Sequence, residues 1–113
     1  MSAITTHVLD LTRGIPASGV SVLLQRRDGS ELVEVGRART NQDGRVGDLV
    51  SDSQSLLPGV YRLVFGVGDY FDRLGEESIF PEVIVELRVD EPRGHLHVPL
   101  LLSAYGYSTY RGS

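Results

Sequence analysis

Apolar side chains recur at every second position along most of this chain, a period typical of strands that bury one face. The clearest example is 83–89, where apolar residues alternate with Ile84, Glu86 and Arg88. The same period, with turn residues between the runs, predicts seven or eight short strands. They are expected over 4–10, 20–28, 32–40, 46–50, 60–65 and 83–89, with two more as a hairpin within 94–113.

One short stretch has helical spacing instead. Tyr70, Phe71 and Leu74 share a helical face, Asp69 is suited to cap the start, and Gly75 is suited to end the last turn. Turn residues at Asp28-Gly29 and 41–45, a polar connection over 51–59 and a turn over 90–94 separate the strands. This arrangement predicts an all-β, two-sheet sandwich with one short helix, as a single domain over 1–113.

The strand phase places all three histidines away from the predicted core. Leu96, Val98, Leu100 and Leu102 share one face of their strand, so His95 and His97 point to the other. In the first strand, Ile4, Thr6 and Val8 share one face, and His7 lies on the other face. A groove, a subunit interface or solvent must therefore receive these imidazoles. Pro99 lacks an N–H, so we expect it at a strand end, edge or bulge. The tyrosine-rich C-terminal end is expected to be docked rather than frayed.

Composition narrows the function classes. The 113 residues carry a formal net charge of -4 and show no concentrated basic face, which argues against nucleic-acid binding. No apolar run of 18 residues and no leader pattern is visible, so no membrane partner is expected. With no cysteine there is neither a disulfide framework nor a thiolate site. These features favour a cytoplasmic location.

The histidines are the strongest chemical signal, because imidazole can exchange a proton near neutral pH. A nearby arginine would lower the pKa of such a histidine and keep it neutral, ready to act as a base. A zinc site formed by His95, His97 and a third histidine is a further possibility, because two imidazoles lie on one strand face. A serine hydrolase is not supported, since no Gly-x-Ser-x-Gly sequence is present. No phosphate-binding loop is present either.

Four segments resemble the 5-hydroxyisourate hydrolases of the transthyretin-like family. They are Ile4-Thr-Thr-His-Val-Leu-Asp10, Thr40-Asn-Gln-Asp-Gly-Arg45, His95-Leu-His-Val-Pro-Leu-Leu101 and the terminal Tyr107-Ser-Thr-Tyr-Arg-Gly-Ser113. The ending Tyr-Arg-Gly-Ser is the most specific of them, because hormone-carrying transthyretins lack it. Ala104 departs from the proline common in the family before Tyr-Gly-Tyr-Ser.

The resemblance implies a homotetramer with active sites in a channel between dimers, and hydrolysis of 5-hydroxyisourate to 2-oxo-4-hydroxy-4-carboxy-5-ureidoimidazoline without a cofactor or metal. It carries catalytic roles onto His7, Arg45, His97 and Ser113, and substrate binding onto Arg45, Tyr110, Arg111 and Ser113. Either His7 or His97 would be the base, and Ser113 would act through its hydroxyl or a terminal carboxylate. No role is carried onto His95.

Two other functions stay open at this point. A transthyretin-type carrier would bind a small aromatic ligand in the channel without chemistry. A zinc-dependent hydrolase is a more distant alternative. The histidines and Arg45 favour the metal-free hydrolase, because a carrier of an apolar ligand needs no base.

Overall fold

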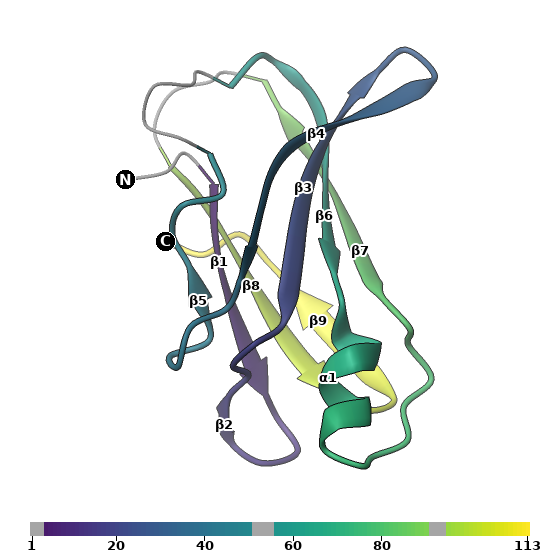
Figure 1. Cartoon of the computed structure of the whole chain (residues 1–113). Helices are drawn as coiled ribbons and strands as arrows, with labels where there is room; N and C mark the ends of the chain where they lie inside the picture. The colour runs from purple at the N-terminus through teal and green to yellow at the C-terminus, as the bar shows by residue number, and fades with distance from the viewer. Residues whose placement is uncertain (1–3, 51–55, 91–94) are drawn as a thin grey trace.

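The computed structural model of the protein describes residues 4–50, 56–90 and 95–113. Within these residues, nine strands form two sheets with one short helix at one end of the sandwich (Figure 1). The prediction of an all-β, two-sheet sandwich with a single helix is confirmed. Part of the predicted connection over 51–59 and most of the turn over 90–94 lie outside the described residues.

The first sheet is organised around β1 (Ile4–Asp10). This strand pairs antiparallel with two short strands, β2 (Ile15–Pro16) and β5 (Arg45–Val46). It also pairs in parallel with β8 (Leu96–Ser103) over its whole length. Next to β8 lies β9 (Gly106–Thr109), the returning strand of the predicted C-terminal hairpin. The chain start and the chain end are thereby brought into one sheet.

The second sheet is an antiparallel meander with the order β4-β3-β6-β7. Its strands are β3 (Ser21–Asp28), β4 (Glu31–Arg39), β6 (Gly59–Phe65) and β7 (Val83–Val89). The predicted turn between β3 and β4 contains Gly29 in a left-handed conformation, which glycine adopts without steric cost. Strands β3, β6 and β7 coincide with the runs of alternating apolar residues in the sequence.

The core lies between the sheets, on the faces that the alternation predicted. Ile4 and Val8 of β1, Leu100 and Leu102 of β8, and Leu63 of β6 have no solvent exposure. Burying a side chain of this size contributes about 1.5–3 kcal/mol. The faces on which His7 and His97 lie are therefore turned away from the core, as expected.

The helix α1 (Val67–Arg73) begins earlier than predicted, and the assignment of Asp69 as its cap is wrong. Gly66 occupies the N-cap position without a side-chain cap, and Asp69 lies in the first turn. Packing of the first helical turn against Pro81 sets this start. The Gly68 N–H donates to the Pro81 carbonyl at 3.0 Å, and the close approach of Pro81 leaves room only for a glycine at position 68. Gly75, with a φ of 70°, follows the helix end as predicted.

Two strand predictions also need correction. The strand expected over 46–50 is limited to Arg45–Val46, because the chain then crosses to β4. Leu49 packs closely against Gly36 of β4: a Cβ at Gly36 would lie 1.7 Å from the Leu49 carbonyl oxygen. Pro99 lies inside β8 rather than at a strand end or edge. Its missing N–H is tolerated because β9 has ended opposite it. The Pro99 carbonyl accepts a hydrogen bond from the Thr109 hydroxyl at 2.7 Å.

A buried carboxylate joins β1 to the helix. Asp10 is 1% exposed and accepts hydrogen bonds from the Tyr70 hydroxyl at 2.8 Å and from the backbone and side chain of Arg13. Burial alone would raise the pKa of Asp10, but these hydrogen bonds outweigh it and hold the pKa below its usual value. Burial and the neighbouring carboxylate raise the pKa of Tyr70 to about 12.

Among the described residues, no helix is long and apolar enough to cross a membrane. The cytoplasmic location stays a prediction.

The strand phase can be tested by truncating one buried and one exposed side chain on neighbouring strands. Leu63→Ala removes a fully buried side chain and should lower the free energy of unfolding by about 2–5 kcal/mol. Ile84→Ala, at a position 42% exposed, should lower it by less than about 1 kcal/mol. Denaturant unfolding of both variants measures the difference, and equal losses would contradict the assigned faces.

Candidate functional site

The outer face of the first sheet collects polar side chains from three strands. The parallel register of β1 and β8 sets Thr5 opposite His97, and the antiparallel register of β1 and β5 sets His7 opposite Arg45. Paired residues on adjacent strands point to the same face. His7, Arg45 and His97 are therefore neighbours on one surface, although 38 and 52 residues separate them along the chain.

A tight loop holds Arg45 in this position. The Asn41 side chain accepts hydrogen bonds from the backbone N–H groups of Asp43 and Arg45, at 2.9 and 3.0 Å. Gly44 has a φ of 75°, and a Cβ there would stand 2.4 Å from the Val8 carbonyl oxygen. The loop thus lies directly against β1, which explains why a turn sequence precedes Arg45.

The C-terminal end reaches the same surface. The Gly112 N–H donates to the His97 carbonyl at 2.7 Å and continues the register of the β8–β9 pairing past Pro99. Figure 1 shows the chain ending beside β5 and the beginning of β1. A Cβ at Gly112 would lie 2.6 Å from Cδ2 of His97, so the glycine allows the terminal segment to pack on this ring. The expectation that the C-terminal end is docked is confirmed.

These elements surround an open hollow of roughly 420 Å³, here called the histidine hollow. It is lined by Thr5, Thr6, Arg45, Val46, Gly47, His95, His97 and Ser113. His7 lies on the same face but does not line the hollow. Three of the four residues expected to be catalytic thus meet around one space, and the fourth is adjacent.

The Thr5 hydroxyl holds both lining histidines. Its Oγ1 lies 2.7 Å from Nε2 of His95 and 2.8 Å from Nδ1 of His97. Thr5 itself is 8% exposed, and the two imidazole ring centroids are 6.2 Å apart. Because Nδ1 of His97 is occupied by Thr5, Nε2 is the nitrogen left to interact with a ligand.

The surroundings of His97 favour its neutral form. Burial lowers the pKa of His97 most, followed by the positive charge of Arg45 and by the neighbouring His95 and His7. A neutral imidazole at neutral pH can accept a proton from water, which a protonated one cannot. Among the described residues, the Arg45 guanidinium makes no hydrogen bond or ion pair that would compete with a ligand.

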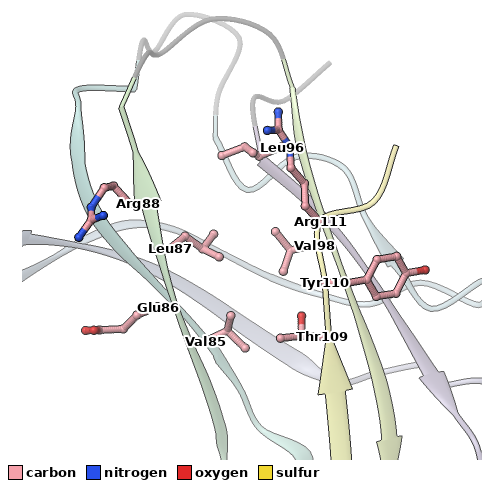
Figure 2. Close-up of a pocket in the computed structure, with 9 residues that line it drawn as sticks. All are labelled: Val85, Glu86, Leu87, Arg88, Leu96, Val98, Thr109, Tyr110 and Arg111. Carbon is pink, nitrogen blue, oxygen red and sulfur yellow. The ribbon is translucent and has the colours of Figure 1, made fainter.

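Two of the expected substrate-binding residues lie elsewhere. Tyr110 and Arg111 line a second hollow of roughly 390 Å³, between β7 and the C-terminal segment. Figure 2 shows Val85 and Leu87 facing Thr109 and Val98 across it, with the Tyr110 ring on the opposite side of the terminal segment from Thr109. The structure does not bring Tyr110 and Arg111 to the lining of the histidine hollow.

Comparison with known proteins identifies the family. The HIUase/Transthyretin family model matches residues 4–112. A 5-hydroxyisourate hydrolase of Caulobacter vibrioides is 44% identical over 117 aligned positions, covering 100% of both chains. The chain belongs to the HIUase/Transthyretin family.

Solved structures of this family agree with the fold. The 5-hydroxyisourate hydrolase of Klebsiella pneumoniae superposes with a TM-score of 0.83 at 37% identity, covering 100% of this chain and 94% of that one. Transthyretin from Sparus aurata superposes with a TM-score of 0.91 at 24% identity, over 99% and 97% of the two chains. At that identity the transthyretin likeness concerns the fold alone.

Two residues of the histidine hollow were not assigned a role from sequence. Thr5 was treated only as part of a strand face, and His95, considered with His97 as a possible zinc ligand, was given no catalytic role. The signal for Thr5 is its place two residues before His7, which puts both side chains on one face. Its contact with His95 and His97 depends on the β1–β8 register. Within the described residues, no cluster of three or more potential metal ligands is present.

The electrostatic contact between Arg45 and His97 can be tested by titration. Arg45→Met removes the positive charge, so the pKa of His97 should rise toward the ordinary histidine value of about 6.5 and stay below it, because burial remains. NMR titration of the His97 ring signals measures this. Arg39→Met, on β4 of the other sheet, is the matched control and should leave the titration unchanged. Identical His97 curves for wild type and Arg45→Met would contradict the assignment.

Proposed function

We propose that this protein hydrolyses 5-hydroxyisourate to 2-oxo-4-hydroxy-4-carboxy-5-ureidoimidazoline in the histidine hollow. The observation that carries the proposal is a half-buried His97, its pKa lowered, beside Arg45 in an open hollow. Relatives 41–44% identical over nearly the whole chain are named 5-hydroxyisourate hydrolases, which supports the same reaction. No cofactor or metal has a role in it.

The reaction adds water across a ring amide. The water oxygen bonds to the ring carbonyl carbon, the C–N bond of the amide breaks, and this carbon becomes the carboxyl group of the product while the nitrogen ends in its ureido group. A base must take a proton from the water during the attack. His97 is the better base of the two candidates, because it lines the hollow with Nε2 available, whereas His7 does not line it.

Arg45, Ser113 and His7 take supporting roles in this scheme. Arg45 binds the urate-like ring and stabilises the negative charge that develops on the carbonyl oxygen. Ser113 lines the hollow and positions the substrate or the water. His7, opposite Arg45 on β1, helps to keep His97 neutral. Tyr110 and Arg111 act at a distance, by holding the terminal segment at the second hollow.

The assembly we propose is a homotetramer with the histidine hollows in a channel between dimers. In the described residues, the edge strands β7 and β9 each pair on one side only, which leaves their other edges open to a second copy. Exposed apolar side chains on β9 and just after it, Tyr107 and Tyr110, support such a contact. Sedimentation analysis would detect the tetramer, and a monomer at micromolar concentration would exclude it.

The hydrolysis is tested by following the decay of freshly generated 5-hydroxyisourate by ultraviolet absorbance. Because this substrate also decays unaided, buffer alone is the reference. Wild type should accelerate the decay, and His97→Ala should lose about 10²–10⁴-fold of the rate through loss of the base. Ile84→Ala, outside the histidine hollow, serves as the folded control. A folded wild type that acts no faster than buffer would reject the enzyme and favour a small-ligand carrier.

The packing of the C-terminal segment on His97 makes a second prediction about rate. Gly112→Ala forces the terminal segment or the ring to move, because the added Cβ would lie 2.6 Å from Cδ2 of His97. Moving the His97 ring or the terminal segment to relieve this contact should lower kcat by about 10- to 100-fold. Gly106→Ala is the matched control, since its Cβ would come no nearer than 3.7 Å to Ser103 Oγ. Equal rates for both variants would contradict this role of Gly112.

A further inference from the structure

The Thr5 hydroxyl contacts both histidines of the histidine hollow. Its Oγ1 lies 2.7 Å from Nε2 of His95 and 2.8 Å from Nδ1 of His97, and the side chain is almost completely buried. The β1–β8 register, which sets Thr5 opposite His97, places the hydroxyl there. A buried hydroxyl between two imidazoles restricts which nitrogen of each ring carries a hydrogen.

The restriction follows from the hydrogen count. A hydroxyl donates one hydrogen and accepts through its lone pairs, and a neutral imidazole has one N–H and one bare nitrogen. If both contacts are hydrogen bonds and both rings are neutral, at most one ring nitrogen accepts from Oγ1, because the hydroxyl has a single hydrogen, and at least one ring nitrogen donates to it. The hydrogen positions of His95 and His97 are therefore linked through Thr5.

We infer that Thr5 is a positioning residue that keeps a hydrogen on Nδ1 of His97 and links the protonation of His97 to that of His95. In this arrangement Nδ1–H of His97 donates to Oγ1, and Oγ1–H donates to Nε2 of His95. Nε2 of His97 is then bare and faces the histidine hollow as a base. In the opposite arrangement Nε2 carries the hydrogen, and His97 has no lone pair for water.

Through the same contacts, the positive charge that arises when His97 takes a proton from water can pass to His95. When Nε2 of His97 takes this proton, Nδ1 passes its hydrogen to Oγ1 while Oγ1 passes its own to Nε2 of His95. His97 becomes neutral again, and the positive charge rests on His95, which is exposed to solvent. Reversal of these transfers, as Nε2–H of His97 protonates the departing ring nitrogen, restores the starting state.

The surroundings of His97 make this transfer useful. His97 is half-buried and faces Arg45 from β5, His7 from β1 and His95 from its own segment, and burial together with these groups lowers its pKa. A positive charge on this ring is therefore costly. Moving the charge to His95 places it on a ring that is exposed to solvent.

This inference rests on the proposed hydrolysis and is tested by kinetics and by a spectroscopic measurement that needs no substrate. Thr5→Val removes the hydroxyl and keeps the shape, and it should lower kcat by about 10- to 100-fold, the usual effect of losing a partner that orients a functional imidazole. KM should change by less than about threefold. Thr5→Ser restores a hydroxyl and should recover most of kcat.

Thr109→Val is the matched control. It removes another strand threonine hydroxyl, which donates to the Pro99 carbonyl and contacts neither histidine, so kcat should be unchanged. Retention of the wild-type kcat by Thr5→Val would overturn the inference.

Nitrogen-15 NMR of the histidine rings at pH 8 reads the hydrogen positions directly. Wild type should show the hydrogen of His97 on Nδ1 and a bare Nε2 on His95, and Thr5→Val should lose this pattern. A hydrogen on Nε2 of His97 in the wild type would overturn the inference, even if Thr5→Val failed to fold. If the wild type showed no hydrolysis, the proposed function would fail, and the spectrum would still decide the role of Thr5.

Discussion

The parallel pairing of β1 with β8 is the constraint on which the rest of the structure depends. It joins residues more than 90 positions apart and runs from Ile4 opposite Leu96 to Asp10 opposite Leu102. On one face this register completes the core with Ile4, Val8 and Leu100. On the other face it brings Thr5 to His97. A shift of one residue would exchange the faces and bury the histidines, so the core and the site are specified together.

The remaining parts of the site are attached to this pair of strands by backbone contacts that need glycine. Gly44 lets the loop that carries Arg45 lie against the Val8 carbonyl, and Gly112 lets the C-terminal segment lie on the His97 ring. Both glycines sit one residue before a side chain that lines the histidine hollow, Arg45 or Ser113. The sequence therefore uses glycine to bring functional side chains close to β1 and β8.

Alternation of apolar residues was sufficient to predict the two sheets, the core faces and the outward direction of all three histidines. It could not predict the helix start or the short β5, because each is set by close packing against a distant backbone, at Pro81 and at Gly36. The interior position of Pro99 was missed for a similar reason: the place where β9 ends opposite β8 is set by the pairing of the two strands.

The candidate site was predictable only in part. The residues His7, Arg45, His97 and Ser113 came from motif resemblance, and their proximity depends on strand register, which local sequence does not encode. The role of Thr5 could not be seen without that register. Tyr110 and Arg111 were assigned to the site through the same motif resemblance, but the structure places both at the second hollow.

The central claim is that the substrate binds in the histidine hollow rather than in the second hollow, between β7 and the C-terminal segment. Titration of the isotope-labelled protein with urate, a stable ring analogue of the substrate, followed by NMR, tests this most directly. The account predicts that the signals of His95, His97 and Arg45 shift on binding, while those of Val85, Leu87 and Thr109 stay in place. Shifts confined to Val85, Leu87 and Thr109 would contradict it.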